Sequence, residues 1–194
     1  MSAGLAKSLR TIADWLDGAD VPFMLAGSFA STYHGHPRTT QDIDIVIDPA
    51  HEALLRFVDS LPADRTYVDR MTAIEAFRHR DMFNVIDLET GWKVDLILRK
   101  ERPFSISEFN RREAVEWMGV RLFIATAEDV ILSKLEWARL SGGSERQMRD
   151  VAGVLEMHNE RLAIAYIEKW LDALAVRTQW EEVAASVRSG EPSS

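Results

Sequence analysis

The spacing of apolar and polar residues predicts alternating helices and strands in the first two thirds of the chain. Leu5, Leu9, Ile12 and Leu16 recur at the intervals of one helix face, which predicts a helix over 5–16. The same criteria predict further short elements, several of them separated by Gly or Pro. The predicted helices cover 29–33, 50–61 and 73–80, and the predicted strands cover 23–26, 42–48, 82–89, 92–98, 113–118 and 121–125.

From residue 126 onward the pattern is helical throughout. The segments TAED (126–129) and SERQ (144–147) have the spacing of capping boxes, so each predicts the start of a helix. Two further helices are predicted over 162–174 and 179–187. The predicted fold class is therefore α/β (α+β). An α/β core covers 1–125, a C-terminal helical subdomain covers 126–188, and a disordered tail covers 189–194.

The amino-acid composition excludes several classes of protein. With 194 residues, 46% apolar and 28% charged, the chain is too apolar to be disordered along most of its length. It contains no cysteine, which excludes disulfides and thiol chemistry and agrees with a cytoplasmic location. The first twenty residues lack the apolar run of a leader or membrane anchor. The net charge of −8 argues against coating nucleic acid by charge alone, although local basic clusters could still bind a nucleic-acid end.

Three aspartates on two predicted strands give the clearest sign of chemistry. Asp42 and Asp44 are two residues apart, so they share one side of their strand, and Asp95 interrupts the apolar residues of another. If the strands are neighbours, the carboxylates converge, and two such charges 4 Å apart repel by roughly 4 kcal/mol at an effective dielectric of 20. The cluster therefore needs divalent cations or raised pKa values. Oxygen ligands suit Mg²⁺ or Mn²⁺ held together with phosphates, and two such ions can stabilise an in-line displacement at phosphorus.

Gly27 and Ser28 lie between a predicted strand and a predicted helix. Such a turn offers backbone N–H groups and a hydroxyl to a phosphate, and glycine allows the chain to approach the ligand closely. Taken singly, a Gly-Ser pair is an ordinary turn and an Asp-x-Asp strand is an ordinary solvent-facing strand. Their order along the chain, together with Asp95, favours phosphate chemistry.

Together, Gly27-Ser28, Asp42-x-Asp44 and Asp95 resemble the signature of the DNA polymerase β-type nucleotidyltransferase superfamily. The segments LAGS (25–28) and RTTQDIDI (38–45) are most similar to its AbiEii-like branch, which includes nucleotidyltransferase toxins of type IV toxin–antitoxin systems. The resemblance covers residues 20–155. It implies the nucleotidyltransferase fold, with a mixed sheet flanked by helices, but it does not identify the substrate.

The resemblance also implies roles for individual residues. Asp42 and Asp44 would bind Mg²⁺ or Mn²⁺, as two ions, and Asp95 would complete the metal site or help to deprotonate the attacking hydroxyl. Ser28, beside Gly27, would contact the triphosphate of an NTP substrate. The acceptor would be RNA such as tRNA, or a protein, and a cognate antitoxin is an expected partner.

Three charged residues outside the carboxylate set are candidates for the same site. Lys134 lies on the apolar face of its predicted helix, where it is either a triphosphate ligand, as in the resembling branch, or a lysine that reaches water from the edge of the face. Asp150 follows Arg149 in a setting similar to that branch, so it either orients Lys134, takes part in catalysis or forms an ordinary ion pair. Arg38 precedes the Asp-x-Asp strand and either guides a phosphate or is a plain surface arginine.

The sequence thus predicts a metal-dependent nucleotidyltransferase that moves a nucleoside monophosphate from an NTP to a hydroxyl acceptor. Two alternatives stay open. One is an aminoglycoside-type enzyme that modifies a small molecule, and the other is a binding protein that has the same fold but does not catalyse. The nucleotide, the acceptor and the oligomeric state are left open as well.

Overall fold

The computed structural model describes residues 3–158 and 161–189, and its contacts divide the chain into two units. Within the described residues, one unit contains 3–26 and 40–124 and the other contains 27–39, 125–158 and 161–189. The sequence places a division at 125/126. The contacts divide the chain at 124/125 and also group 27–39 with the helical residues, because the helix in this segment packs on helices from the C-terminal half.

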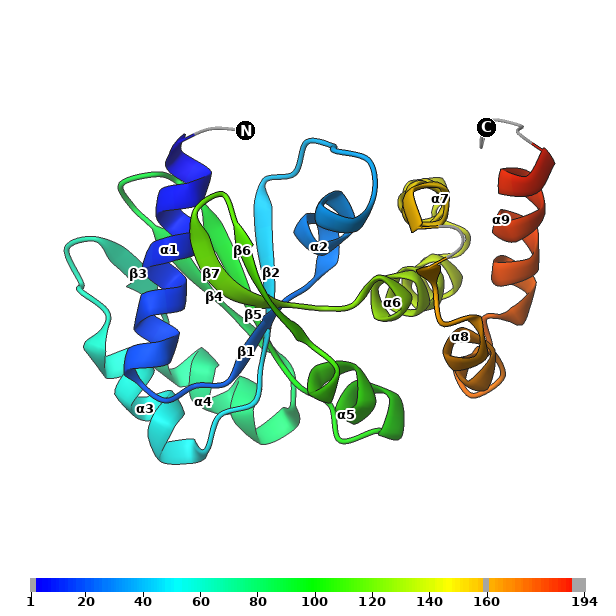
Figure 1. Cartoon of the computed structure of the whole chain (residues 1–194). Helices are drawn as coiled ribbons and strands as arrows, with labels where there is room; N and C mark the ends of the chain where they lie inside the picture. The colour runs from blue at the N-terminus through cyan, green and yellow to red at the C-terminus, as the bar shows by residue number, and fades with distance from the viewer. Residues whose placement is uncertain (1–2, 159–160, 190–194) are drawn as a thin grey trace. The chain divides into compact units, whose positions relative to one another are not determined.

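The first unit is built on a mixed sheet, which has seven strands in the described residues and the order β3-β4-β5-β2-β1-β7-β6 (Figure 1). The pairs β2/β5 and β1/β7 are parallel, and the other neighbouring pairs are antiparallel. The predicted mixed sheet flanked by helices is therefore confirmed. The strands are β1 (Phe23–Leu25), β2 (Asp42–Ile47), β3 (Thr66–Val68), β4 (Met82–Asp87), β5 (Lys93–Leu98), β6 (Glu113–Trp117) and β7 (Val120–Ile124).

Helices cover one side of this sheet. Figure 1 shows α1, α3 and α4 together on that side, and the apolar stripe predicted for α1 is buried. Strand β3 was not predicted because its three residues show neither a period nor an apolar run. Helix α5 was not predicted because its buried positions include the polar residues Ser105 and Glu108, which interrupt the apolar pattern. The helices of this unit are α1 (Ala3–Gly18), α3 (His51–Ser60), α4 (Arg70–His79) and α5 (Pro103–Asn110).

The central strands have one buried and one more accessible face. Ile43, Ile45 and Ile47 of β2 are buried, whereas the intervening residues are half-buried. The same alternation places Val94 and Leu96 of β5 in the core. The apolar side chains thus fix which way each strand faces, and the polar side chains must all emerge on the opposite face.

The second unit is helical in its described residues. Thr126 caps α6 by accepting a hydrogen bond from the backbone N–H of Asp129, as the capping-box spacing predicts. Residues 190–194 of the predicted tail lie outside the described residues, and Ser189 ends the last helix. Across the described residues, no helix combines the length and apolar character that a membrane crossing requires. The helices of this unit are α2 (Gly27–His34), α6 (Ala127–Leu140), α7 (Glu145–His158), α8 (Ile164–Leu171) and α9 (Arg177–Ser189).

Candidate active site

The three predicted carboxylates lie on one face of the sheet. Strands β2 and β5 are parallel and in a register that places Asp42 opposite Lys93 and Asp44 opposite Asp95. Residues directly opposite each other in neighbouring strands share a face. Asn84 of β4 lies opposite Asp95 and donates a side-chain N–H to its Oδ1. Asp44, Asp95 and Asn84 therefore form a polar row across three adjacent strands.

Lys93 supplies a positive charge to this row. Its Nζ lies 3.2 Å from Oδ1 of Asp95 and 3.4 Å from Oδ1 of Asp42. Burial by itself would lower the pKa of Lys93, but the hydrogen bond and charge of Asp95, followed by those of Asp42, raise that pKa above its ordinary value. Lys93 is thus a stable cation between two carboxylates. Neither Lys93 nor Asn84 was predicted from the sequence. The two-residue spacing from Lys93 to Asp95 is the signal that could have placed Lys93 on the same face as Asp95.

The chemistry of the donors fits a divalent cation that the substrate helps to bind. Among the described residues, no group of three or more His, Asp or Glu side chains is arranged to hold a metal ion by itself. Mg²⁺, however, is usually held by one or two carboxylates together with substrate phosphates and water. Asp44 is half-buried, Asp95 is buried, and both offer oxygen ligands on the same face. These two residues suit such an ion, with Asp42 beside them.

A second charged cluster lies within the helical unit and centres on Asp150 of α7. Arg38 donates from Nε to Oδ1 of Asp150 over 2.8 Å, and Nζ of Lys134 lies 2.8 Å from its Oδ2. Arg38 also donates from Nη2 to Oγ of Ser28, and Ser31 donates to Asp150 over 3.4 Å. The Lys134 and Asp150 side chains are only 6% and 7% exposed. The structure thus brings together four residues that the sequence analysis selected from separate segments.

Gly27 begins α2 in a backbone conformation that favours glycine. Its φ is +57°, in the left-handed region where a Cβ is strained. Ser28 follows it and accepts the Arg38 hydrogen bond. The predicted turn therefore holds a hydroxyl next to a guanidinium, which is a pairing that suits phosphate oxygens.

Two glycines allow the segment that carries Arg38 to lie against α7. A Cβ on Gly35 would stand 2.9 Å from the backbone nitrogen of Val154, and a Cβ on Gly153 would stand 2.9 Å from Cδ2 of His36. Neither position tolerates a side chain without movement of its neighbours. This close approach brings Arg38 to Asp150, and no motif in the sequence indicated it.

Acid lowers the stability of the protein through His34. The Nε2–H of this buried ring donates to the Ala125 carbonyl over 2.8 Å, and the ring packs on His158 with centroids 5.4 Å apart. Burial has the largest effect and lowers the pKa of His34 below its ordinary value, and the charge of His158 lowers this pKa further. The hydrogen bond to Ala125 and the charge of Glu128 oppose the shift without cancelling it. Around and below pH 6.5 the unfolded chain therefore binds more protons than the folded chain. The free energy of unfolding consequently decreases as the pH is lowered.

Urea unfolding at pH 7.5 and 5.5 measures this effect. We expect a lower free energy of unfolding at pH 5.5, and a smaller difference between the two pH values in His34→Gln. His79→Gln is the control, because His79 is exposed and should leave the difference unchanged. An equal pH dependence in His34→Gln and the wild type would contradict the role of His34.

No family model matches the sequence, and no curated protein matches it. Solved structures do. An antigenic nucleotidyltransferase-like protein from Paracoccidioides brasiliensis superimposes with a TM-score of 0.60 at 15% identity, over 96% of this chain and 93% of that one. The chain has the nucleotidyltransferase fold. The antibiotic-resistance factor ANT(2'')-Ia matches with a TM-score of 0.57 at 11% identity, over 98% of both chains.

A third similar structure is the lincosamide antibiotic adenylyltransferase LnuA, crystallised with lincomycin bound. Its TM-score is 0.52 at 14% identity, over 76% of this chain and 94% of that one. The TM-scores of these three structures establish a common nucleotidyltransferase fold, and identities this low show nothing beyond the fold. The AbiEii-like branch stays a prediction from the sequence.

Proposed function

We propose that the protein is a metal-dependent nucleotidyltransferase that moves a nucleoside monophosphate from an NTP to a hydroxyl acceptor and releases pyrophosphate. The observation that carries this proposal is the strand register that sets Asp44 opposite Asp95, with Asp42 on the same face, within a nucleotidyltransferase fold. A bond forms between the acceptor oxygen and the α-phosphorus, and the bond from that phosphorus to the bridging oxygen breaks. Pyrophosphate leaves with the electron pair.

The carboxylate face supports the metal-binding part of the proposal. Asp44 and Asp95 would hold the cation, with Asp42 contributing from the same strand as Asp44. The cation, when bound, supplies charge that orients the triphosphate and offsets the charge that develops during transfer. Asp95 either completes this site or accepts the proton of the attacking hydroxyl. The Asn84 hydrogen bond holds one Asp95 oxygen in place in either case.

The helical cluster supports the nucleotide-binding part. Ser28, with the backbone of Gly27, and the cations Arg38 and Lys134 would bind the triphosphate. Asp150 contacts both cations and so positions them. A buried aspartate between two cations costs much less than an isolated buried charge. Guanidinium and ammonium groups are also the side chains that bind phosphate oxygens most strongly.

Labelled-nucleotide transfer tests the proposal. The purified protein is incubated with each of the four α-³²P-labelled NTPs, Mg²⁺ or Mn²⁺, and a cell extract, and the products are separated. We expect label in a discrete product with at least one NTP, and loss of that product when the cation is chelated. Absence of transfer with every NTP, together with no thermal stabilisation by NTP and Mg²⁺, would favour the non-catalytic binding protein.

A small-molecule acceptor is the second candidate function. Among the similar structures, ANT(2'')-Ia is an antibiotic-resistance factor that was also crystallised with adenylyl-2''-tobramycin, and LnuA is an antibiotic adenylyltransferase. Incubation with labelled NTP and either total tRNA or a panel of aminoglycosides separates the two acceptor classes. The toxin role and its antitoxin partner remain predictions from the sequence resemblance.

Removing the Lys93 charge is expected to strengthen binding of a divalent cation. In Lys93→Met the carboxylates of Asp42 and Asp95 lose the cation that lies between them, so Mn²⁺ no longer competes with an ammonium group. Lys93 is partly exposed, and a pair of this kind is worth about 1 kcal/mol, which corresponds to an affinity gain of about fivefold.

Titration calorimetry of Mn²⁺ without nucleotide measures this gain directly. Lys100→Met is the matched control, because Lys100 is exposed and its substitution removes the same charge from the same unit. Equal Mn²⁺ affinity in the wild type and both variants would mean that Lys93 does not face the metal site.

A further inference from the structure

A cavity of about 580 Å³ lies within the helical unit, between residues 36–39 and α7. Arg38 from the first of these segments lines the cavity together with Arg146 and Arg149 from α7. The two α7 arginines are three residues apart, so they lie on the same face of the helix. Three guanidinium groups therefore surround one cavity in a chain whose net charge is −8.

The acidic residues of the cavity already have partners. Asp150 is bound by Arg38 and Lys134, and Glu156 lies 2.8 Å from Nε2 of His36. With histidine neutral, three arginines and two carboxylates line the cavity, and Lys134 further neutralises Asp150. The cavity is consequently positive in a chain that is acidic as a whole.

Arg146 and Arg149 take no part in these ion pairs. Both are exposed, and neither makes a hydrogen bond or ion pair with any residue in the described part of the chain. Two like charges on one helix face destabilise that helix slightly unless an anion lies between or beside them. Guanidinium groups bind phosphate oxygens in a bidentate manner, so phosphate is the anion that this arrangement suits.

We propose that this cavity binds backbone phosphate of a single-stranded nucleic-acid acceptor, which makes that strand, and not a cationic antibiotic, the substrate that receives the nucleotide. The inference rests on the proposed function and specifies its acceptor. A volume of about 580 Å³ lies within the usual range for binding pockets. A strand needs such a local positive site, because the rest of an acidic chain repels it. The same positive charge disfavours aminoglycosides, which are polycations.

Binding of RNA to the full-length protein tests this without any catalytic step. The probe is a fluorescein-labelled 20-nucleotide single-stranded RNA, and its anisotropy is followed over a range of salt concentrations without NTP or metal. We expect Arg146→Gln/Arg149→Gln to weaken binding at least about tenfold at low salt. Each lost phosphate contact on a single strand should reduce the slope of log K against log salt by about 0.7, so the double variant should lose about 1.4.

The control double variant is Arg121→Gln/Arg161→Gln. These arginines are also exposed and make no hydrogen bond or ion pair within the described residues, and they do not line the cavity. The loss of net charge is the same, so RNA affinity should stay within about twofold of the wild type. Equal weakening in both double variants would overturn the proposal, because it would show a general charge effect. Lack of RNA binding by the wild type would overturn it as well.

Thermal shifts with NTP and Mg²⁺ on the same variants separate this inference from the proposed function. We expect Arg146→Gln/Arg149→Gln to keep the wild-type shift. If that variant loses the NTP shift, the cavity serves the nucleotide and the acceptor assignment is wrong. If it binds RNA like the wild type while NTP transfer persists, the inference alone fails. If RNA binding behaves as expected but no labelled NTP is ever transferred, the proposed function fails.

Discussion

Asp44→Asn abolishes nucleotide transfer, with kcat/KM expected to fall at least about a thousandfold, while the protein stays folded. The substitution keeps the shape of the side chain but removes the charge that would hold the cation opposite Asp95. Losing one preorganised electrostatic contact commonly costs two to three orders of magnitude, and a carboxylate that binds metal contributes at least as much. Asp44 is half-buried on an accessible face, so the core beneath it is unaffected.

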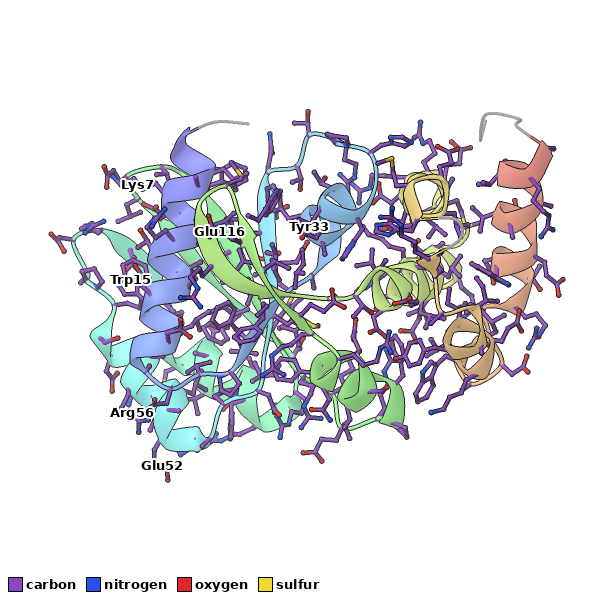
Figure 2. All side chains as sticks on the ribbon, viewed as in Figure 1. Lys7, Trp15, Tyr33, Glu52, Arg56 and Glu116 are labelled. Atoms are coloured by element: carbon purple, nitrogen blue, oxygen red, sulfur yellow. The ribbon has the colours of Figure 1, made fainter. Side chains whose placement is uncertain are left out.

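Initial rates of labelled-NTP incorporation measure this loss, and circular dichroism with a thermal melt checks the fold. Glu116→Gln is the matched control. It also replaces a strand carboxylate by its amide, but Glu116 is exposed on β6 (Figure 2) and outside the candidate site. Its transfer rate should equal that of the wild type. Retention of transfer in purified Asp44→Asn, at even a tenth of the wild-type rate, would remove the metal-binding role from this carboxylate.

Asp150→Ala is expected to lower the free energy of unfolding by about 3 kcal/mol, the cost typical of breaking a buried ion pair from one side. The Lys134 ammonium, whose side chain is 6% exposed, loses its carboxylate partner, and Arg38 loses both of its hydrogen bonds to Asp150. Transfer should fall at the same time, because the two cations are no longer held towards the triphosphate.

Urea unfolding measures the stability change, and two further variants interpret it. Glu75→Ala breaks an exposed pair with Arg78 and should have a much smaller effect. Lys134→Met/Asp150→Leu replaces the buried pair with apolar side chains, so it should recover most of the lost stability while transfer stays low. If both stability and transfer recovered in this double variant, the Lys134–Asp150 pair would have a structural role only. A change in Asp150→Ala no larger than in Glu75→Ala would show that the cluster is not buried in solution.

The local elements of the candidate site were predictable because they depend on residues close together in the chain. The period of two in residues 42–48 correctly separated Asp42 and Asp44 from the buried isoleucines of β2. The two hairpins β4/β5 and β6/β7 were likewise indicated by the turns between them. The same dependence on local pattern explains why β3 and α5 were missed. Strand β3 has only three residues, and the buried positions of α5 include Ser105 and Glu108, which interrupt its apolar pattern.

The residues that contact the site residues were harder to predict from the sequence. Lys93 and Asn84 reach Asp95 through pairing of β5 with β2 on one side and with β4 on the other. The approach of Gly35 to Gly153 joins segments more than a hundred residues apart, and it lets Arg38 reach Asp150. No period or motif contains such contacts, because they arise from the packing of whole elements.

By itself the sequence indicated the candidate site residues and which face of each strand presents them, since alternation and capping are set by near neighbours in the chain. Only the tertiary structure decided what each of these groups touches. Strand register aligned Asp44 with Asp95, and helix packing placed Asp150 between Arg38 and Lys134. The reason is physical: a buried charge is stable only beside its counter-charge, and here that counter-charge comes from a distant part of the chain.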